Sequence, residues 1–330
     1  MTTSNDPRGR LAELYSAPQT NLATPAAAPG DTFVSRNFYD WTPSPQSEPQ
    51  DDDVMGAGFE NSIDARPAAP DVHRASARVA WPLDLVQFGY ALTELLGAPV
   101  SAGETAPYSH TFTSSKVQIP SRTFERKLGA AAFDGLVGAV CRSLQFPIGA
   151  DRGYTRVGAE FFAREALEQY GASVAGTPTA LALSARVPRA VGAIKRDGVA
   201  LGQIISGDVT ITNVLGEDSY HGSRFIDDVQ VEGRTVAFNL TGRYKGAALR
   251  DLGKVDVGTY LPGVQDIELS WTLSADLKLV LTVRNVRFAV AGVSTGGPGR
   301  LDVPLRGRAE IGVSDPMVTA VLTNGQASYA

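Results

Sequence analysis

DIELSWTLSADLKLVLTVRNVRFAV, residues 266–290, carries the alternation from which the class of fold follows. Apolar and polar side chains alternate along its first half, where the apolar ones are Ile267, Leu269, Trp271 and Leu273. After a polar turn at Ser274-Ala275-Asp276, the alternation resumes with Leu277, Leu279, Leu281 and Val283. Successive side chains of a strand point to opposite faces of the sheet. The stretch therefore predicts a long β-hairpin with one apolar and one polar face.

The same period of two dominates the chain downstream of Gly97. It predicts strands at 108–113, 209–213, 235–241, 300–305 and 317–324. Glu232-Gly233 is predicted to be a second hairpin turn, and FVSRNFYDW (33–41) to be one strand. No repeat of fixed period is found. The fold class predicted is mainly β: an antiparallel β-sandwich or barrel with one or two short helices and long loops.

One segment has a helical period instead. In WPLDLVQFGYALTELLG (81–97), a single stripe at helical spacing is formed by Leu85, Phe88, Leu92, Leu95 and Leu96. Asp84 lies near the start, where a carboxylate favours the helix dipole, and Gly97 suits the end. We predict a helix over residues 83–96 that covers one face or end of a sheet with core side chains.

Composition divides the chain into three parts. Residues 1–20 are predicted to be a flexible segment, 21–80 a strand followed by a Pro-rich extended loop, and 81–330 the sandwich or barrel domain. The loop at 42–71 has little to bury by itself, so we expect an assembly arm, the alternative being a surface loop without a role. Its contact points would be its large apolar residues, Val54, Met55, Phe59 and Ile63.

Charge and cysteine content argue against several classes of function. The net charge is −5 and the pI about 5.3, which gives no basic surface for nucleic acid. The N-terminus lacks an apolar signal segment and no apolar run approaches a membrane span, so a soluble protein is expected. Cys141 is the only cysteine, which excludes an internal disulfide and favours a buried apolar role. No glycine-rich nucleotide-binding motif follows a strand.

Residues that could carry chemistry are scattered. His73, His110 and His221 have no histidine or cysteine at ligand spacing, so no zinc site is predicted. The run Asp51-Asp52-Asp53, near Glu48, is interpreted as a solvated loop tip, because consecutive carboxylates do not converge on one Ca²⁺ ion.

PYSHTFTSSKVQIPSRTFERKLG (107–129) is the stretch that most resembles the wall of an active site. Its His110 shares the apolar face of a strand with Tyr108 and Phe112, which indicates a structural histidine. Glu125 stands next to Arg126, which indicates a surface ion pair rather than a general acid. We therefore predict no catalytic, cofactor-binding or metal-binding residue, and no enzyme.

Several segments follow one another in a characteristic order. They are FVSRNFYDWTPSP, WPLDLVQFGYALTELLGAP, YSHTFT, PSRTFERKLG, FDGLVGAVCRSLQFPIGADRGYTRVGAEFFARE, ISGDVTITNVLGED and VEGRTVAFNLTGRYKG. In the fifth and most specific, a turn at Ala150-Asp151-Arg152-Gly153 joins two strands. Over about residues 30–325 this order resembles the tail tube (major tail) proteins of long-tailed bacteriophages.

The resemblance implies a structural protein of the virion tail, assembled in the host cytoplasm. It implies hexameric rings that stack into a hollow tube around a tape-measure protein, with further tail proteins as partners. DNA would pass through the lumen without specific binding, and no cofactor or membrane is implied. The acidic net charge fits, because a channel lined with Lys and Arg would retain phosphates.

Two other classes of function remain open at this point. A β-sandwich module that binds carbohydrate or another ligand would need exposed aromatic residues, whereas Trp271 lies on the apolar row of its strand. A β-barrel enzyme could bring any two of the 35 carboxylates together in space, but the sequence singles out no pair.

Overall fold

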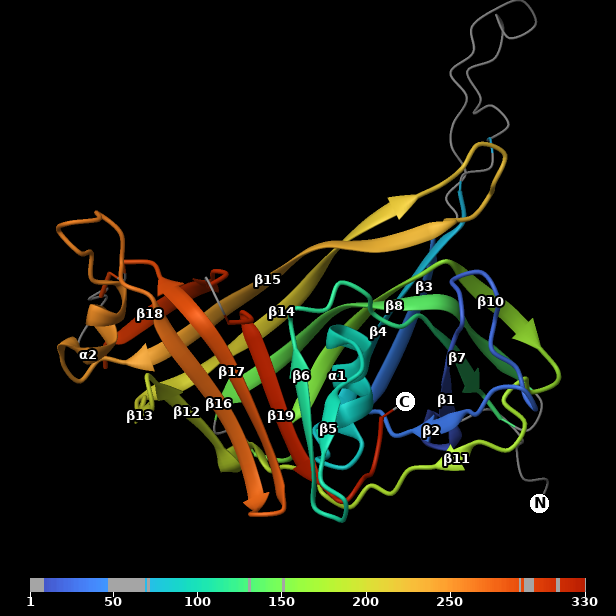
Figure 1. Ribbon diagram of the computed structural model, residues 1–330, viewed down its shortest axis with the longest axis horizontal. Coiled ribbons are helices and arrows are strands. Elements are labelled where there is room, and N and C mark those ends of the chain that lie inside the picture. Colours follow the sequence, from blue (N-terminus) through green and yellow to red (C-terminus); the bar gives the residue numbers. More distant parts are fainter. Residues whose placement is uncertain are drawn as a thin grey trace, which may run out of the picture.

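The structure is a computed structural model that describes residues 9–46, 69, 72–129, 132–149, 152–290, 292–293, 300–312 and 315–329. Figure 1 shows an elongated molecule in which strands predominate, with helix α1 (Phe88–Leu96) near the middle. The predicted mainly β fold class is confirmed. The strands form two sheets that share one long strand.

The smaller sheet lies at one end of the molecule. Its order is β11 (Thr179–Ala180), β2 (Val34–Arg36), β1 (Glu13–Pro18), β7 (Arg122–Lys127), the first half of β8 (Phe133–Gly149) and β10 (Glu165–Tyr170). Strand β1 lies between β2 and β7 with buried side chains, so the prediction that residues 1–20 are flexible is wrong for Glu13–Pro18.

The larger sheet continues from the second half of β8. On one side lie β9 (Arg156–Ala163), β4 (Arg74–Pro82) and β3 (Asp40–Gln46). On the other lie β14 (Ile204–Asp218), β15 (Asp228–Arg243), β18 (Asp302–Ala309), β17 (Leu277–Phe288), β16 (Gln265–Ser274), β12 (Gly192–Arg196) and β13 (Val199–Ala200). A branch leaves β17 through β19 (Val318–Asn324), β6 (Tyr108–Thr113) and β5 (Val100–Ala102).

Strand β8 joins the two sheets because its two halves have different neighbours. Residues 133–139 pair with β7 and β10, and residues 140–149 pair with β9 and β14. Gly138 lies at the change of partners with a φ of +64°, and a Cβ there would stand 2.7 Å from the Leu22 carbonyl oxygen. The Gly138 amide donates a hydrogen bond of 2.8 Å to Gln19 Oε1. Only glycine fits this backbone and this close approach.

The hairpin predicted from residues 266–290 is confirmed as β16 and β17, which pair in antiparallel register. One residue departs from the predicted alternation. Leu273 lies at a register shift between Thr272 and Ser274, and 38% of it is exposed, although the pattern placed it on the apolar row. The bulge turns its side chain away from the core.

Two turn and strand predictions are wrong. Glu232-Gly233 is not a hairpin turn, because both residues lie inside β15. The register shifts there from Val214–Gly233 to Leu215–Val231, so Glu232 is the extra residue of a β-bulge. FVSRNFYDW does not form one strand but contributes to β2 and β3, with a break between them. Strand β3 runs on into the Pro-rich segment, which an edge strand tolerates because an outward-facing proline leaves no ladder bond unmade.

Helix α1 begins at Phe88, five residues after the predicted start at residue 83. The cause is Asp84, whose Oδ1 accepts hydrogen bonds from the amides of Val86 (2.9 Å) and Gln87 (3.3 Å) and holds a turn there. The helix ends at Leu96, and Gly97 follows with a φ of +86° as predicted. Every residue of the helix is buried, so it is enclosed on all sides rather than covering one sheet face. The other helices of the described residues are short: η1 (Gly9–Leu11), η2 (Arg189–Val191), α2 (Ala247–Arg250) and η3 (Asp251–Gly253).

One apolar core runs through both sheets and α1. It includes Trp41, Trp81, Phe88, Phe112, Phe124, Phe146, Phe161, Phe238, Trp271 and Phe288. A second, smaller cluster lies under the β1–β2 connection and consists of Tyr15, Ala17, Ala26, Phe33 and Ala175. The inward-facing rows of the predicted strands are in the main core, which is why the period of two was informative.

Candidate functional site

His110 is buried on β6 and both of its ring nitrogens have partners. Nε2 is 2.8 Å from the carbonyl oxygen of Gln326, and Nδ1 is 2.7 Å from the Ser101 hydroxyl. A carbonyl only accepts, so Nε2 carries the proton and Nδ1 accepts from Ser101. Its burial and its two hydrogen bonds are those expected of a structural histidine.

Glu125 contradicts the surface ion pair predicted for it. It is fully buried on β7, and its carboxylate accepts hydrogen bonds from Ser173 Oγ (2.5 Å), Tyr170 Oη (2.8 Å) and the Val174 amide (2.7 Å). Its neighbour Arg126 pairs instead with Asp134, at 2.5 Å. Adjacent strand residues point to opposite faces, which separates the two charges. Glu125 therefore ties residues 170–174 to the smaller sheet.

A buried charge cluster joins α1 to the smaller sheet, and sequence reasoning missed it. Glu94 of α1 lies 2.6 Å from Arg36 of β2 and 3.1 Å from Arg122 of β7. The Arg36 guanidinium also lies 4.3 Å from the centre of the Trp81 ring. Burial lowers the pKa of Arg122. Arg36 and Glu94 are 58 positions apart in the chain and lie on different elements, so no local pattern could have found the cluster.

The remaining predicted sites are placed as follows. His73 stacks on Phe225 with 5.2 Å between ring centres, and His221 is exposed in the loop after β14. Cys141 is buried as predicted, and burial raises the pKa of its thiol. Asp51–Asp53 and the four apolar residues proposed as arm contacts lie outside the described residues. The part of the chain that the structure describes contains no cluster of three potential metal ligands and no helix able to cross a membrane.

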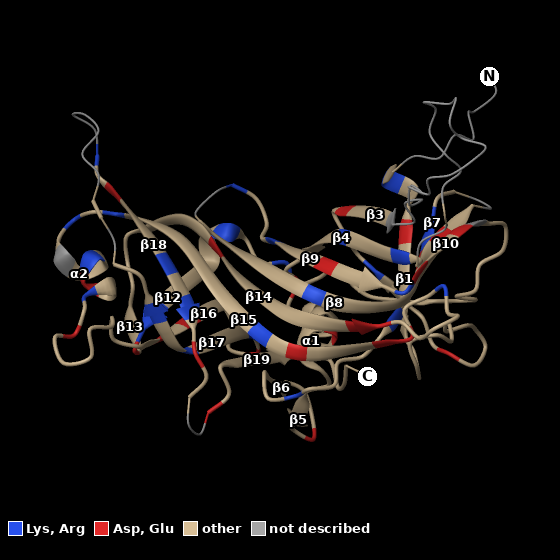
Figure 2. Cartoon of the chain, turned by 90° about the horizontal axis from the view of Figure 1, so that it is seen from above, with Lys and Arg blue, Asp and Glu red and all other residues tan. Residues whose placement is uncertain are grey.

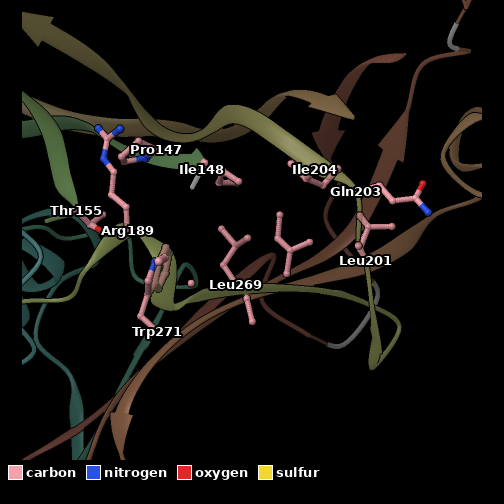
Figure 3. Close-up of a pocket in the computed structure, with 15 residues that line it drawn as sticks. Pro147, Ile148, Thr155, Arg189, Leu201, Gln203, Ile204, Leu269 and Trp271 are labelled. Carbon is pink, nitrogen blue, oxygen red and sulfur yellow. The ribbon is translucent and has the colours of Figure 1, made fainter. Parts of the chain in front are cut away.

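Figure 3 shows a cavity between the β8–β14 edge and β16. Its volume is about 210 Å³, and its apolar lining includes Ile148, Ile194, Leu201, Ile204, Leu269 and Trp271. Arg189 and Gln203 supply polar groups at its border (Figure 3). Trp271 is 4% exposed and stacks on Phe146 with 5.7 Å between ring centres. The cavity can accept an apolar group, but Trp271 offers no exposed platform for a sugar.

The broadest surface of the molecule is the outward face of β8, β14 and β15, which lie side by side along its length (Figure 2). Neutral residues on this face include Thr210, Thr212, Thr235, Ala237, Asn239 and Thr241, and the charged residues Asp208 of β14 and Arg142 of β8 lie among the same strands. Charged residues flank it, and two of the cations are paired, Arg78 with Glu160 (3.8 Å) and Arg243 with Asp302 (2.8 Å). The face is polar and carries both signs of charge, because Arg306 and Arg308 of β18 lie in register beside Asn239 and Ala237.

The length of this face is set by the hairpin of β14 and β15. Strands β14 and β15 pair from Ile204–Gly242 to Asp218–Asp228, which makes them a single antiparallel ribbon. Val209, Ile211, Val236, Phe238 and Leu240 fill the core from the opposite face. Because side chains alternate along a strand, a sheet with one face in water has polar side chains on that face and apolar side chains on the face toward the core.

Comparisons with known proteins point to one family. No curated protein matches the chain. Among solved structures, the crystal structure of the Ralstonia pickettii toluene transporter TbuX is 9% identical over 95% of this chain and 88% of that chain, and its TM-score of 0.09 carries no argument about the fold. The family model described as phage tail tube protein matches residues 9–310. With nearly the whole described fold inside that match, the chain belongs to the phage tail tube protein family.

Proposed function

We propose that this chain forms hexameric rings that stack into the tube of a phage tail, through which DNA is delivered. Membership of the tail tube family carries the proposal, since it implies a structural tail component that assembles with itself and with other tail proteins. Six copies would close a ring through a head-to-tail contact between different patches of the same chain. The chain would act without chemistry of its own, as a virion protein assembled in the host cytoplasm.

The outward face of β8, β14 and β15 supports the proposal. It is long and polar, with a row of threonines along β14 and β15, as a surface that lines a water-filled channel should be. A lumen with unpaired cations would hold DNA phosphates and slow their passage. The threonine, alanine and asparagine side chains at the centre of this face present no positive charge to a polyanion.

The mass of the purified protein in solution tests the proposal. We expect a species of six times the 34.8 kDa chain, together with larger multiples as rings stack. The measurement should extend to high protein concentration and be repeated with tail partners, because assembly follows mass action. A chain that remains monomeric in all of these conditions would refute the proposed function.

A further inference from the structure

An exposed apolar tip lies at the α2 end of the molecule, in the loop that connects η3 to β16 (Figure 1). We call residues 254–264 the tip loop. Val257 is 84% exposed, Tyr260 81% and Leu261 51%. Single exposed apolar residues are common on protein surfaces. Three large ones within five positions of one loop form an apolar patch whose exposure to water is unfavourable.

The tip loop is fixed in this form by its own hydrogen bonds. The Tyr260 amide donates to the Asp256 carbonyl (2.8 Å), and the Asp256 amide donates to the Leu261 carbonyl (3.0 Å). The Gly258 amide donates to Asp256 Oδ1 at 2.9 Å. Tyr260 has a φ of +56°, a backbone conformation unfavourable for a tyrosine. The loop thus holds its apolar side chains outward in a pre-formed arrangement, which lowers the entropy cost of a contact.

A basic groove runs beside the tip loop. It has a volume of about 320 Å³, and it is lined by Pro262, Phe288, Gly307, Arg287, Arg306 and Arg308. Arg287 is held by two hydrogen bonds to Glu310, of 3.0 and 2.8 Å, and Arg308 lies 3.5 Å from the same carboxylate. Arg306 is exposed and has no carboxylate partner among the described residues. Three guanidinium groups are therefore set against one carboxylate, which leaves the groove positive.

The opposite end of the molecule carries a carboxylate that is unpaired among the described residues. Acidic residues mark β10 at the far end from α2 in Figure 2. Glu168 is exposed there and has no cation partner within the described part of the chain, while Glu165 lies 4.0 Å from its neighbour Arg164. The basic end and the acidic end lie at opposite extremes of the long axis (Figure 1). This separation is what a head-to-tail contact between copies requires, because it joins two different patches.

We propose that the tip loop and its basic groove dock against the β10 end of a second copy of this chain. Tyr260 and Leu261 would bury their side chains in that contact, and Arg306 would pair with Glu168. The inference rests on the proposed self-assembly, and it specifies which two ends of the chain meet within the ring.

Cross-linking between copies tests this docking directly. A full-length variant with Tyr260→Cys and Glu168→Cys is treated with a flexible bis-maleimide during assembly. The native Cys141 is buried and does not compete. The two new thiols lie at opposite ends of one chain, so only a contact between copies can link them. We expect a ladder of covalent multimers that closes at a limiting size, whereas single-cysteine variants should stop at dimers.

The control is Val100→Cys with Glu168→Cys, since Val100 is also solvent-facing, 67% exposed, and lies on β5 near the middle of the molecule (Figure 1). We expect it to yield at least tenfold fewer multimers.

A second measurement is the assembled fraction of serine variants. The double variant Tyr260→Ser with Leu261→Ser should reduce this fraction at least tenfold, whereas Val100→Ser, at a residue 67% exposed on β5, should not reduce it.

The outcomes separate this inference from the proposed function. If the parent forms six-membered rings but the tip variants cross-link and assemble no differently from the controls, the docking is refuted and the tube proposal stands. If ladders form through the two introduced thiols but close at another size, the docking is supported and the hexamer is wrong. If no assembly and no ladder occur, both are refuted.

Discussion

At the level of single residues, the structure uses buried charge to attach elements that the chain separates. Glu94, Arg36 and Arg122 come from α1, β2 and β7 and meet out of contact with water. Such a cluster stabilises little relative to a well-packed apolar substitute, but it is costly to break, because removing one partner leaves uncompensated charge. The packing of α1 against the smaller sheet therefore depends on this cluster.

The first prediction follows from that asymmetry. Glu94→Gln should lower the free energy of unfolding by about 3–5 kcal/mol, because two buried guanidinium groups lose the carboxylate they share. Urea unfolding followed by circular dichroism measures the effect. Glu168→Gln, at an exposed position, is the control and should change stability by less than about 0.5 kcal/mol. Equal losses for the two variants would show that the cluster does not matter.

The second prediction concerns alkaline pH. Burial raises the pKa of Tyr15, Tyr170 and Tyr329, the first two with a further contribution from a hydrogen-bonded carboxylate, above the ordinary value of about 10. Since the folded pKa is raised, the stability is fully present below pH about 10 and is lost as pH rises beyond it. Phenolate absorbance should show these three tyrosines titrating only as the protein unfolds. Titration of these three tyrosines near pH 10 in folded protein would contradict this.

At the level of elements, strand β8 organises the fold. It is 17 residues long and pairs with one set of strands in its first half and another set in its second half. A change of partners on both edges requires a local bend, which Gly138 supplies. The neighbouring chain approaches so closely at this point that a side chain has no room.

The third prediction tests this bend. Gly138→Ala should lower the free energy of unfolding by about 1–3 kcal/mol, because its φ of +64° is strained for alanine. The Cβ would also stand 2.7 Å from the Leu22 carbonyl oxygen and 2.9 Å from Arg164 Cβ. Gly202→Ala, where nothing lies within 4 Å of the added Cβ, is the matched control. A Gly138→Ala protein as stable as the control would show that β8 needs no glycine.

The sequence predicts those elements whose pattern is local. The β16–β17 hairpin and the buried His110 follow from a period of two, which is set by strand geometry alone. The Glu232 bulge breaks that period in a way that resembles a turn, since both features interrupt alternation at a glycine. The late start of α1 depends on the Asp84 side chain competing for backbone amides. The environment of Glu125 depends on residues 45–49 positions away, which local patterns do not contain.

Across the molecule as a whole, the distribution of charge matters more than the net value of −5. The long outward face has a threonine row along β14 and β15, with Asp208 and Arg142 close to it, and the cations Arg78 and Arg243 are in ion pairs. The basic groove borders this face on its β18 side, where Arg306 and Arg308 lie beside Asn239 and Ala237. A tube in which Arg306 and Arg308 are buried between copies would present the threonine row of this face to the DNA.

The fourth prediction follows for DNA. Assembled tubes should not retain duplex DNA in a gel-shift assay at about 150 mM salt, where exposed charges are screened beyond about 8 Å. Thr210→Lys with Thr235→Lys, on the middle of the face, should introduce retention that weakens steeply as salt rises. Micromolar binding of DNA by the parent tubes would mean that the lumen is formed by another, basic face.

Closure of six copies of this chain into rings that stack is the property on which its proposed function depends. Electron microscopy of the purified protein at high concentration, with two-dimensional class averages of end-on and side views, makes that closure visible. We predict end-on views with six-fold symmetry around an open channel and side views of regularly spaced, stacked rings. Particles that remain single elongated monomers, or closed rings of another symmetry, would contradict the proposal.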